Sequence, residues 1–400
     1  MARMASCSAK QRISVIVPTY NRSDFLPAAV ASLVSQTSPP CEIIVVNDGS
    51  DYDVRALLRD QGPLVKVLDK ENAGKPAAVN LGVSHAKGEY VWVFDDDDIA
   101  ELDYIEKCQP HLESAAIDYV FGWHYAGESL SANQVNKTTE RRPRLEADRD
   151  IFAALLSGCS IAHNAIIAKR TCYLELGGMD TSYPCSEDYE FQLRLAQRFA
   201  GHYLDLPSFT RRMHSGDRGG KEFRYRASER RQRFLEQDRR FIESYLEKLP
   251  ISEYWIQSFE RIEDERLRLR AQYLYKFQVA AGVGLWNVAV KTLQDAAGDP
   301  NCASSALSSH EVRQISDVFT YAEADVLARF ELSAHAVAID QLALTSPRLF
   351  LGDVKRTLLR SMAKRTMLQA RNLHGYNTLQ AARIFFNLLR HVRFRETGSG

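Results

Sequence analysis

The chain has 400 residues, of which 45% are hydrophobic and 26% are charged. These proportions fit a folded protein of two or three domains, and they exclude wholesale disorder, a collagen-like rod and a small disulfide-stapled scaffold. Lysine plus arginine equals aspartate plus glutamate, at 51 each, so the net charge is zero. The overall charge therefore indicates no particular partner, and we expect no nucleic-acid partner.

The seven cysteines are scattered and include no Cys-x-x-Cys pair. This pattern indicates unpaired thiols in a reducing cytosol, and neither a zinc site nor a disulfide framework. The first twelve residues lack an apolar core of signal-peptide length, and no run approaches the ~18 to 20 apolar residues that a membrane-spanning helix needs. We therefore expect a cytoplasmic protein, either soluble or bound peripherally to the inner face of a membrane.

Short β-branched runs alternate with helical patterns from residue 12 to about residue 215, which is typical of a sheet built from βαβ units. The predicted strands are 13–17, 42–46, 65–68 and 90–94, and the predicted helices are 25–34, 77–86 and 189–199. Nearly continuous apolar strands require a sheet covered on both faces, and such sheets bind ligands beyond the C-terminal ends of their strands. Polar sequence follows three of these strands, so we expect the chemistry at that edge.

Strand patterns end at about residue 222, and helical spacing takes over. Helices are predicted at 234–249, 254–280, 284–297, 309–330, 333–344 and 350–372. We therefore divide the chain into an α/β domain over 12–220 and a helical C-terminal domain over 221–397.

The end of the chain is strongly basic. Between Asp353 and Glu396 there are ten lysines and arginines and no acid besides those two residues. Residues 382–395 predict a helix that is basic on one side and aromatic or aliphatic on the other. Such a helix indicates contact with an anionic membrane surface or a protein groove. It is equally compatible with a terminal helix docked on its own bundle, with its arginines in water.

Four aspartates, Asp95 to Asp98, follow the fourth predicted strand. Adjacent carboxylates repel one another, and each raises its neighbours' pKa unless a cation neutralises them. Mg²⁺ and Mn²⁺ are typically bound by one or two carboxylates together with phosphate oxygens. An isolated acidic run would more often be a solvated helix cap, but the position at the ligand edge of a sheet favours a divalent metal site.

Two turns and one loop at the same edge carry further candidates. The segment Pro18-Thr19-Tyr20-Asn21 follows the first strand, and Asn47-Asp48-Gly49-Ser50 follows the second. A carboxylate there can accept from a base N–H and a tyrosine can stack on its ring, although each segment alone is an ordinary turn. Lys75 lies where a loop meets a helix, and helix N-termini attract anions. The loop lacks P-loop spacing, which argues against an NTPase of that class.

Glu187 and Asp188 open the predicted helix 189–199. Carboxylates in a first helical turn are favoured by the helix dipole, so this pair is also compatible with simple capping. The neighbouring Cys185 has no activating histidine in sequence reach, so we do not expect it to act as a nucleophile.

Read in order, seven segments resemble the family 2 nucleotide-sugar glycosyltransferases of GT-A fold, of the type that builds bacterial polysaccharides and other glycans. The segments are PTYNR, NDGS, ENAGKPAAVNLG, GEYVWVFDDDD, GGMD, SEDYEFQLRLA and RRMH. The resemblance covers residues 12 to about 215. It implies an α/β fold with a Rossmann-like, mostly parallel sheet and flanking helices. The helical C-terminal region lies beyond what these motifs explain.

The resemblance also implies roles for the donor side of the site. Thr19, Tyr20 and Asp48 would hold the nucleoside, with Asp48 at the base. Lys75 would lie near the base or the diphosphate, and Asp96 would point toward the ribose.

A divalent cation, Mn²⁺ or Mg²⁺, is implied in the same way. Asp95 and Asp97 match the family's metal motif, and His214 matches a position that often completes the metal or diphosphate site. Because positions 95 to 98 are all aspartate, the register could also slip by one, which would put Asp96 or Asp98 at the ion.

For the acceptor side, the resemblance implies that Glu187 faces the acceptor and that Asp188 is the general base. The predicted activity is that of a metal-dependent inverting glycosyltransferase (EC 2.4). It would move a sugar from a nucleotide diphosphate sugar, usually UDP-linked in this family, to a hydroxyl of a glycan or lipid-linked glycan. Two alternatives remain: a nucleotidyl- or phosphate-transfer enzyme using the same acidic site, and an inactive GT-A binding module with a helical scaffold.

Overall fold

The computed structural model of the chain describes residues 12–131, 134–143, 145, 147–213 and 229–299, with the isolated positions 302, 311, 312, 315, 354 and 357. The chain divides into two compact units, one of residues 1–155 and 159–237 and the other of 156–158 and 238–400. The predicted boundary at 220 falls in 214–228, outside the described residues, and stays a prediction.

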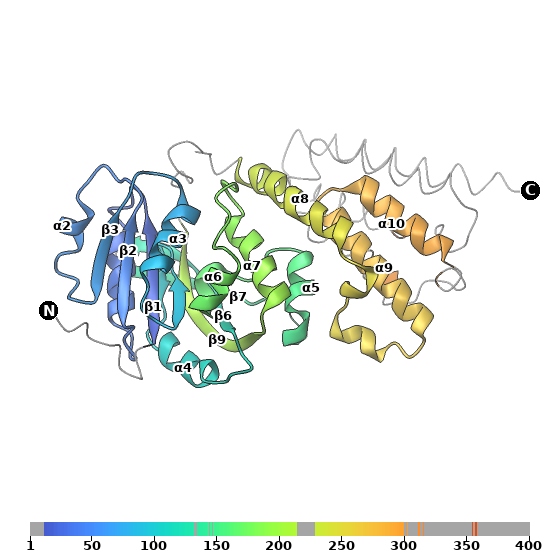
Figure 1. Cartoon of the computed structure of the whole chain (residues 1–400), viewed down its shortest axis with the longest axis horizontal. Helices are drawn as coiled ribbons and strands as arrows, with labels where there is room; N and C mark the ends of the chain where they lie inside the picture. The colour runs from blue at the N-terminus through green and yellow to red at the C-terminus, as the bar shows by residue number, and fades with distance from the viewer. Residues whose placement is uncertain are drawn as a thin grey trace, which may run out of the picture. The chain divides into compact units, whose positions relative to one another are not determined.

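A sheet of nine strands, counted over the described residues, forms the centre of the first unit (Figure 1). Its strands are β1 (Ile13–Thr19), β2 (Glu42–Asn47), β3 (Val65–Asp69), β4 (Tyr90–Val93), β5 (Ile99–Ala100), β6 (Tyr119–Ser131), β7 (Gln134–Arg141), β8 (Ile166–Lys169) and β9 (Gly201–Met213). The strand order is β3-β2-β1-β4-β8-β6-β9-β5, and β7 pairs with β6.

The sheet is parallel in the half that the sequence predicted and mixed in the other half. Strands β3, β2, β1 and β4 are parallel neighbours, whereas β8 is antiparallel to both β4 and β6. The α/β prediction with flanking helices is confirmed. The strands after β4 make the sheet mixed, because β8 enters it in the opposite direction.

Seven helices of the first unit flank or connect these strands. They are α1 (Leu26–Val34), α2 (Val54–Leu58), α3 (Lys75–His85), α4 (Tyr104–Leu112), α5 (Ile151–Leu156), α6 (Arg170–Glu175) and α7 (Glu187–Arg198). Short 3₁₀ turns lie at Asp148–Asp150 and His163–Ala165.

Side chains of β1 alternate between two layers of helices, as the period of two along a strand requires. Ile13, Val15 and Val17 belong to one buried cluster with residues of α1, α2 and α4. Ile16 faces α3, which approaches so closely at Gly82 that a Cβ there would lie 2.4 Å from Ile16 Cγ2. Helix α3 is therefore seated directly on the sheet.

The second unit is helical in its described residues, which agrees with the predicted helical C-terminal region. Helix α8 (Arg230–Lys248) crosses the boundary between the units at residue 238, and α9 (Glu265–Gly282) and α10 (Trp286–Gly298) follow it, with 3₁₀ turns at Ile251–Glu253 and Gln257–Arg261. Helix α10 matches the predicted 284–297. Helix α9 begins later than the predicted residue 254, because Asp264 caps it by accepting from Arg266 N at 2.8 Å.

The helices predicted after residue 300 and the basic segment 382–395 lie almost wholly outside the described residues. Among the helices that are described, none is both long and apolar enough to cross a membrane.

Candidate active site

The parallel strands end together at one edge of the sheet. Thr19 pairs with Asn47, and Asn47 pairs with Asp69. The amide of Phe94 donates to the carbonyl of Ile16, which brings the acidic run after β4 beside the end of β1. This is the edge at which open α/β sheets bind ligands.

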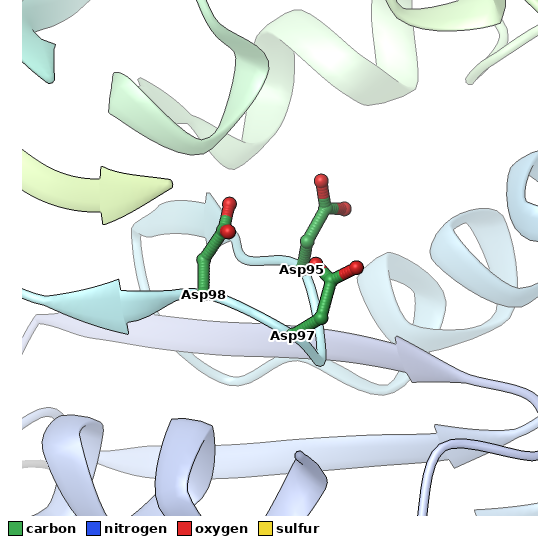
Figure 2. A group of neighbouring side chains, drawn as sticks. All are labelled: Asp95, Asp97 and Asp98. Carbon is green, nitrogen blue, oxygen red and sulfur yellow. The ribbon is translucent and has the colours of Figure 1, made fainter. Parts of the chain in front are cut away.

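Three of the four aspartates come together on the loop after β4. Asp95, Asp97 and Asp98 each offer a carboxylate oxygen, and these oxygens lie within 4.8 Å of one another (Figure 2). Burial, and then the charge of Asp97, raises the pKa of Asp98 well above its usual range. An all-oxygen donor set with mutual repulsion suits a hard divalent cation. The predicted Asp95–Asp97 pair is thus joined by Asp98, one of the two positions left open by the run of four.

Asp96 does not belong to this cluster. It is buried, and the groups that interact with its carboxylate include the hydroxyl of Thr19 and the guanidinium of Arg22. Burial and the charge of Asp97 raise the pKa of Asp96 to about 8, against the opposing effect of Thr19 and Arg22. Asp96 and Thr19 are therefore neighbours at the end of β1, beside the cluster of Asp95, Asp97 and Asp98.

Two residues that the sequence did not single out hold the acidic loop. Asn164, in the 3₁₀ turn at 163–165, donates from Nδ2 to Asp98 Oδ2 at 2.7 Å. Its main-chain carbonyl accepts from Trp92 Nε1 at 2.7 Å, so it is anchored to β4 as well. The amide of Arg212 on β9 donates to Asp98 Oδ1 at 2.9 Å. Both oxygens of Asp98 are thereby oriented from outside the loop.

The side chain of Arg212 grips the same loop. Its Nε donates to the carbonyl of Asp97 at 3.0 Å, and its Nη1 donates to Ser129 Oγ and to the carbonyl of Ser131. The guanidinium also lies 5.0 Å from the ring centroid of Phe25. Arg212 is 1% exposed, so this is a buried cation that fixes the loop after β4 against β6 and β9.

Lys75 joins the acidic loop from α3. Its Nζ lies 2.5 Å from Asp95 Oδ1. Burial would lower the pKa of Lys75, but the charges of Asp95, Glu187 and Asp188 outweigh burial and raise it. Helix α3 begins at Lys75, two residues before the predicted start, so the cation lies in the first turn of a helix, where the dipole also attracts anions.

Glu187 and Asp188 face the same cation from the first turn of α7. Burial and the charge of Asp188 raise the pKa of Glu187 to about 7, although Lys75 opposes the rise. Asp188 Oδ1 accepts from the amide of Tyr189 at 2.9 Å. Ser186, which precedes the pair, has a left-handed backbone with φ of +59°, a strained conformation for a residue with a side chain. The N-termini of α3 and α7 thus present one cation and two carboxylates to each other.

Asp48 is engaged with the loop that leads into α3. Its carboxylate accepts from Lys70 Nζ at 2.5 Å, from Asn72 Nδ2 at 3.2 Å, and from the amides of Ala73 and Gly74 at 3.0 and 2.8 Å. Asp48 therefore ties the end of β2 to the loop before Lys75. Tyr20 is half-buried and directly follows Thr19 at the end of β1.

His163 is a third residue that sequence reasoning missed. It is 3% exposed, and its Nε2 lies 3.2 Å from Tyr173 Oη. Burial and the nearby charge of Lys75 lower the pKa of His163 to about 4, while Asp188 and Asp95 oppose this effect. It is therefore a neutral imidazole beside the charged groups. His214, the remaining predicted residue, lies outside the described residues.

Comparisons with known proteins point to one family. The model of a family described as glycosyl transferase family 2 matches residues 14–171. An uncharacterized glycosyltransferase of Haemophilus influenzae is 30% identical over 201 residues, which are 50% of this chain and 64% of that protein. The uncharacterized glycosyltransferase YwdF of Bacillus subtilis is 30% identical over 196 residues, 47% of this chain and 69% of its own.

Among solved structures, TarS of S. aureus resembles the chain with a TM-score of 0.47 and 15% identity, over 87% of this chain and 55% of TarS. The chain spans a little under two thirds of the Haemophilus relative and of two Rickettsia relatives.

Proposed function

The chain belongs to glycosyl transferase family 2, and on that premise we propose that it transfers a sugar from a nucleotide diphosphate sugar to an acceptor hydroxyl. The observation that carries the proposal is the convergence of Lys75, the acidic cluster and Asp188 at one edge of the sheet. A departing diphosphate needs cationic partners, and an attacking hydroxyl needs a base. Both requirements are met within this group.

Asp188 is the proposed general base. The acceptor oxygen bonds to the anomeric carbon as the bond from that carbon to the diphosphate breaks, and Asp188 takes the hydroxyl proton. General-base help of this kind typically contributes about 10²- to 10⁴-fold. A single displacement inverts the anomeric configuration. Glu187, beside Asp188, is proposed to face the acceptor.

Lys75 and the acidic cluster are proposed to bind the diphosphate. Asp95, Asp97 and Asp98 would hold Mn²⁺ or Mg²⁺, and a bound divalent cation neutralises the charge that accumulates on the leaving oxygens. Lys75 supplies a fixed positive charge next to Asp95. His214 is proposed as a further ligand of the metal or the diphosphate.

The nucleoside is proposed to lie at the ends of β1 and β2. Thr19, Tyr20 and Asp96 would surround the ribose and base, and Asp48 would meet the base from a carboxylate already oriented by Lys70. We propose UDP as the nucleotide and a glycan or lipid-linked glycan as the acceptor. The basic segment 382–395 would place the protein peripherally on the inner face of a membrane, where such acceptors are made.

A panel of UDP-, GDP- and dTDP-sugars, assayed for release of nucleoside diphosphate, tests the proposal. We expect release that requires an acceptor and a divalent cation, with inverted product configuration by NMR. Release of pyrophosphate would instead identify a nucleotidyl transferase. Donor binding by calorimetry without turnover, for every acceptor class supplied, would identify an inactive binding module.

A further inference from the structure

The loop at 176–179 is fastened from two sides. On one side, Asn80 of α3 donates from Nδ2 to the carbonyl of Met179 at 2.8 Å, and Asn80 Oδ1 accepts from the amide of Met179 at 2.8 Å. One carboxamide thereby satisfies both main-chain groups of a residue 99 positions away. Only a side chain with a donor and an acceptor at this length can make both bonds.

On the other side, Arg194 of α7 holds the same loop. Its Nη1 donates to the carbonyl of Leu176 at 2.8 Å, and its Nη2 donates to the carbonyl of Gly178 at 3.0 Å. Glu190 accepts from the same guanidinium at 2.7 Å, which locks its orientation. The hydrogen-bonded path therefore runs from Asn80 on α3, through the main chain of Gly178 and Met179, to Arg194 on α7.

Gly178 is required where this path is tightest. Its φ is +80°, and a Cβ placed on it would lie 2.5 Å from Asn80 Oδ1. A side chain at position 178 would strain the backbone and push directly against the carboxamide. Met179, next to it, is 2% exposed, so the loop has no room to move outward without uncovering an apolar side chain.

The two helices joined by this path carry the proposed reacting groups in their first turns. Lys75 lies five residues before Asn80 on α3, and Asp188 lies six residues before Arg194 on α7. Helix α3 is fixed independently, because it is seated on β1 and β2 at Gly82. The first turn of α7 has an anchor of its own, because Tyr189 Oη donates to the carbonyl of Leu155 at 2.5 Å. What depends directly on Asn80 is therefore the loop at 176–179, which passes the constraint to α7 through Arg194.

We propose that Asn80 is a positioning residue that sets where Asp188 stands relative to Lys75. We call the set Asn80, Gly178, Met179 and Arg194 the Asn80 joint. This inference rests on the proposed glycosyl transfer, because it says that the Asn80 joint sets the distance between the general base Asp188 and the leaving diphosphate at Lys75. Placement errors of about 1 Å at a reacting group can cost ~10²-fold in rate.

The test is Asn80→Ala, with Glu42→Gln as matched control. Glu42 is a buried acceptor at the opposite end of β2, bonded to Ser14, Lys66 and the amide of Lys87. We expect Asn80→Ala to lower kcat about 10- to 100-fold and to leave donor affinity within about threefold, because Lys75 stays on the seated helix. Glu42→Gln should lower the melting temperature comparably and leave kcat unchanged.

A second variant approaches the joint from the other side. Gly178→Ala should lower kcat in the native background, and it should cost clearly less in an Asn80→Ala background, because the oxygen that its Cβ meets is gone. Additive losses from the two substitutions would contradict the joint. An unchanged kcat in Asn80→Ala would also contradict the joint, and so would an equal loss of kcat in Glu42→Gln.

Hydrogen exchange separates failure of the joint from failure of the proposed function. Asn80→Ala should speed exchange at Met179 and at the start of α7, where the amide of Glu190 bonds to the carbonyl of Ser186, and Glu42→Gln should not. If the native chain turns over no donor, this local exchange still decides whether Asn80 positions α7. Unchanged exchange would overturn the inference whatever the activity.

Discussion

Glu187 should make the stability of the metal-free protein fall as pH rises. Its pKa is raised from an ordinary value of 4.5 to about 7 by burial and by Asp188. A carboxyl with a raised pKa in the folded state holds its proton more tightly there than in the unfolded chain. The contribution of the Glu187 carboxyl to the free energy of unfolding is thus fully present below pH 4.5, and it is lost as pH rises through 7.

The size of the effect follows from that pKa. At about 1.4 kcal/mol per tenfold change in proton affinity, the rise from 4.5 to about 7 corresponds to at most about 3 kcal/mol. The solvent-accessible surface of Glu187 shows that the residue is only partly buried. Solvent screening therefore reduces the expected free energy to about 1–2 kcal/mol. Glu187→Gln removes the ionisation, and we expect it to stabilise the protein by that amount at pH 8 and by nearly nothing at pH 4, below the ordinary pKa of 4.5.

Urea unfolding in the presence of a chelator measures this difference. Glu71→Gln, which neutralises an exposed glutamate at the same edge of the sheet, is the control, and it should show no such pH-dependent gain. An equal gain for Glu187→Gln at both pH values would show that its carboxyl is not destabilised by its surroundings. A loss of stability at pH 8 would reverse the sign and refute the electrostatic reasoning.

Four further predictions concern the reaction and the basic segment. Asp97→Ala should abolish transfer and weaken donor binding measured by calorimetry with Mn²⁺, and full native activity in excess chelator would rule out a metal role. Asp188→Asn should lower kcat by about 10²- to 10⁴-fold with little change in donor affinity, and parallel loss of donor binding would reassign it to the nucleotide. Asn164→Ala should raise the Mn²⁺ concentration needed for half activity by about 10- to 100-fold, because Asp98 loses its orienting donor; an unchanged metal dependence would make Asn164 purely structural. Removal of 382–395 should abolish salt-sensitive pelleting with anionic liposomes while catalysis on a soluble acceptor continues, and equal pelleting of both chains would contradict a membrane role for the segment.

The local sequence was enough to predict most of the parallel half of the sheet. Strands β1, β2 and β4 are short, largely apolar runs that stop at polar residues, so their extent and their ends were both visible. Strands β6 and β9 were missed because each extends over 13 residues and mixes buried with exposed positions. Their pairing with each other and with β8 is long-range, and no local pattern encodes it.

The candidate site divides in the same way. The chain order of Asp95 to Asp98, Lys75 and Glu187-Asp188 indicated which residue types meet, because each follows a strand or opens a helix at the ligand edge. Which three of four identical aspartates cluster depended on the direction in which the loop after β4 turns. That direction is imposed by Asn164 and Arg212, which lie 66 and 114 residues away from Asp98.

The sequence by itself thus determined the fold class, the edge of the sheet that carries the proposed site and the charged residues gathered there, because strand ends, helix starts and carboxylate runs are local features. Only the tertiary structure decided the grouping of Asp95, Asp97 and Asp98, the neutral His163 beside them and the link from Asn80 to Arg194. Each of these features depends on hydrogen bonds or packing between segments far apart in the chain, and such contacts form only when the chain has folded.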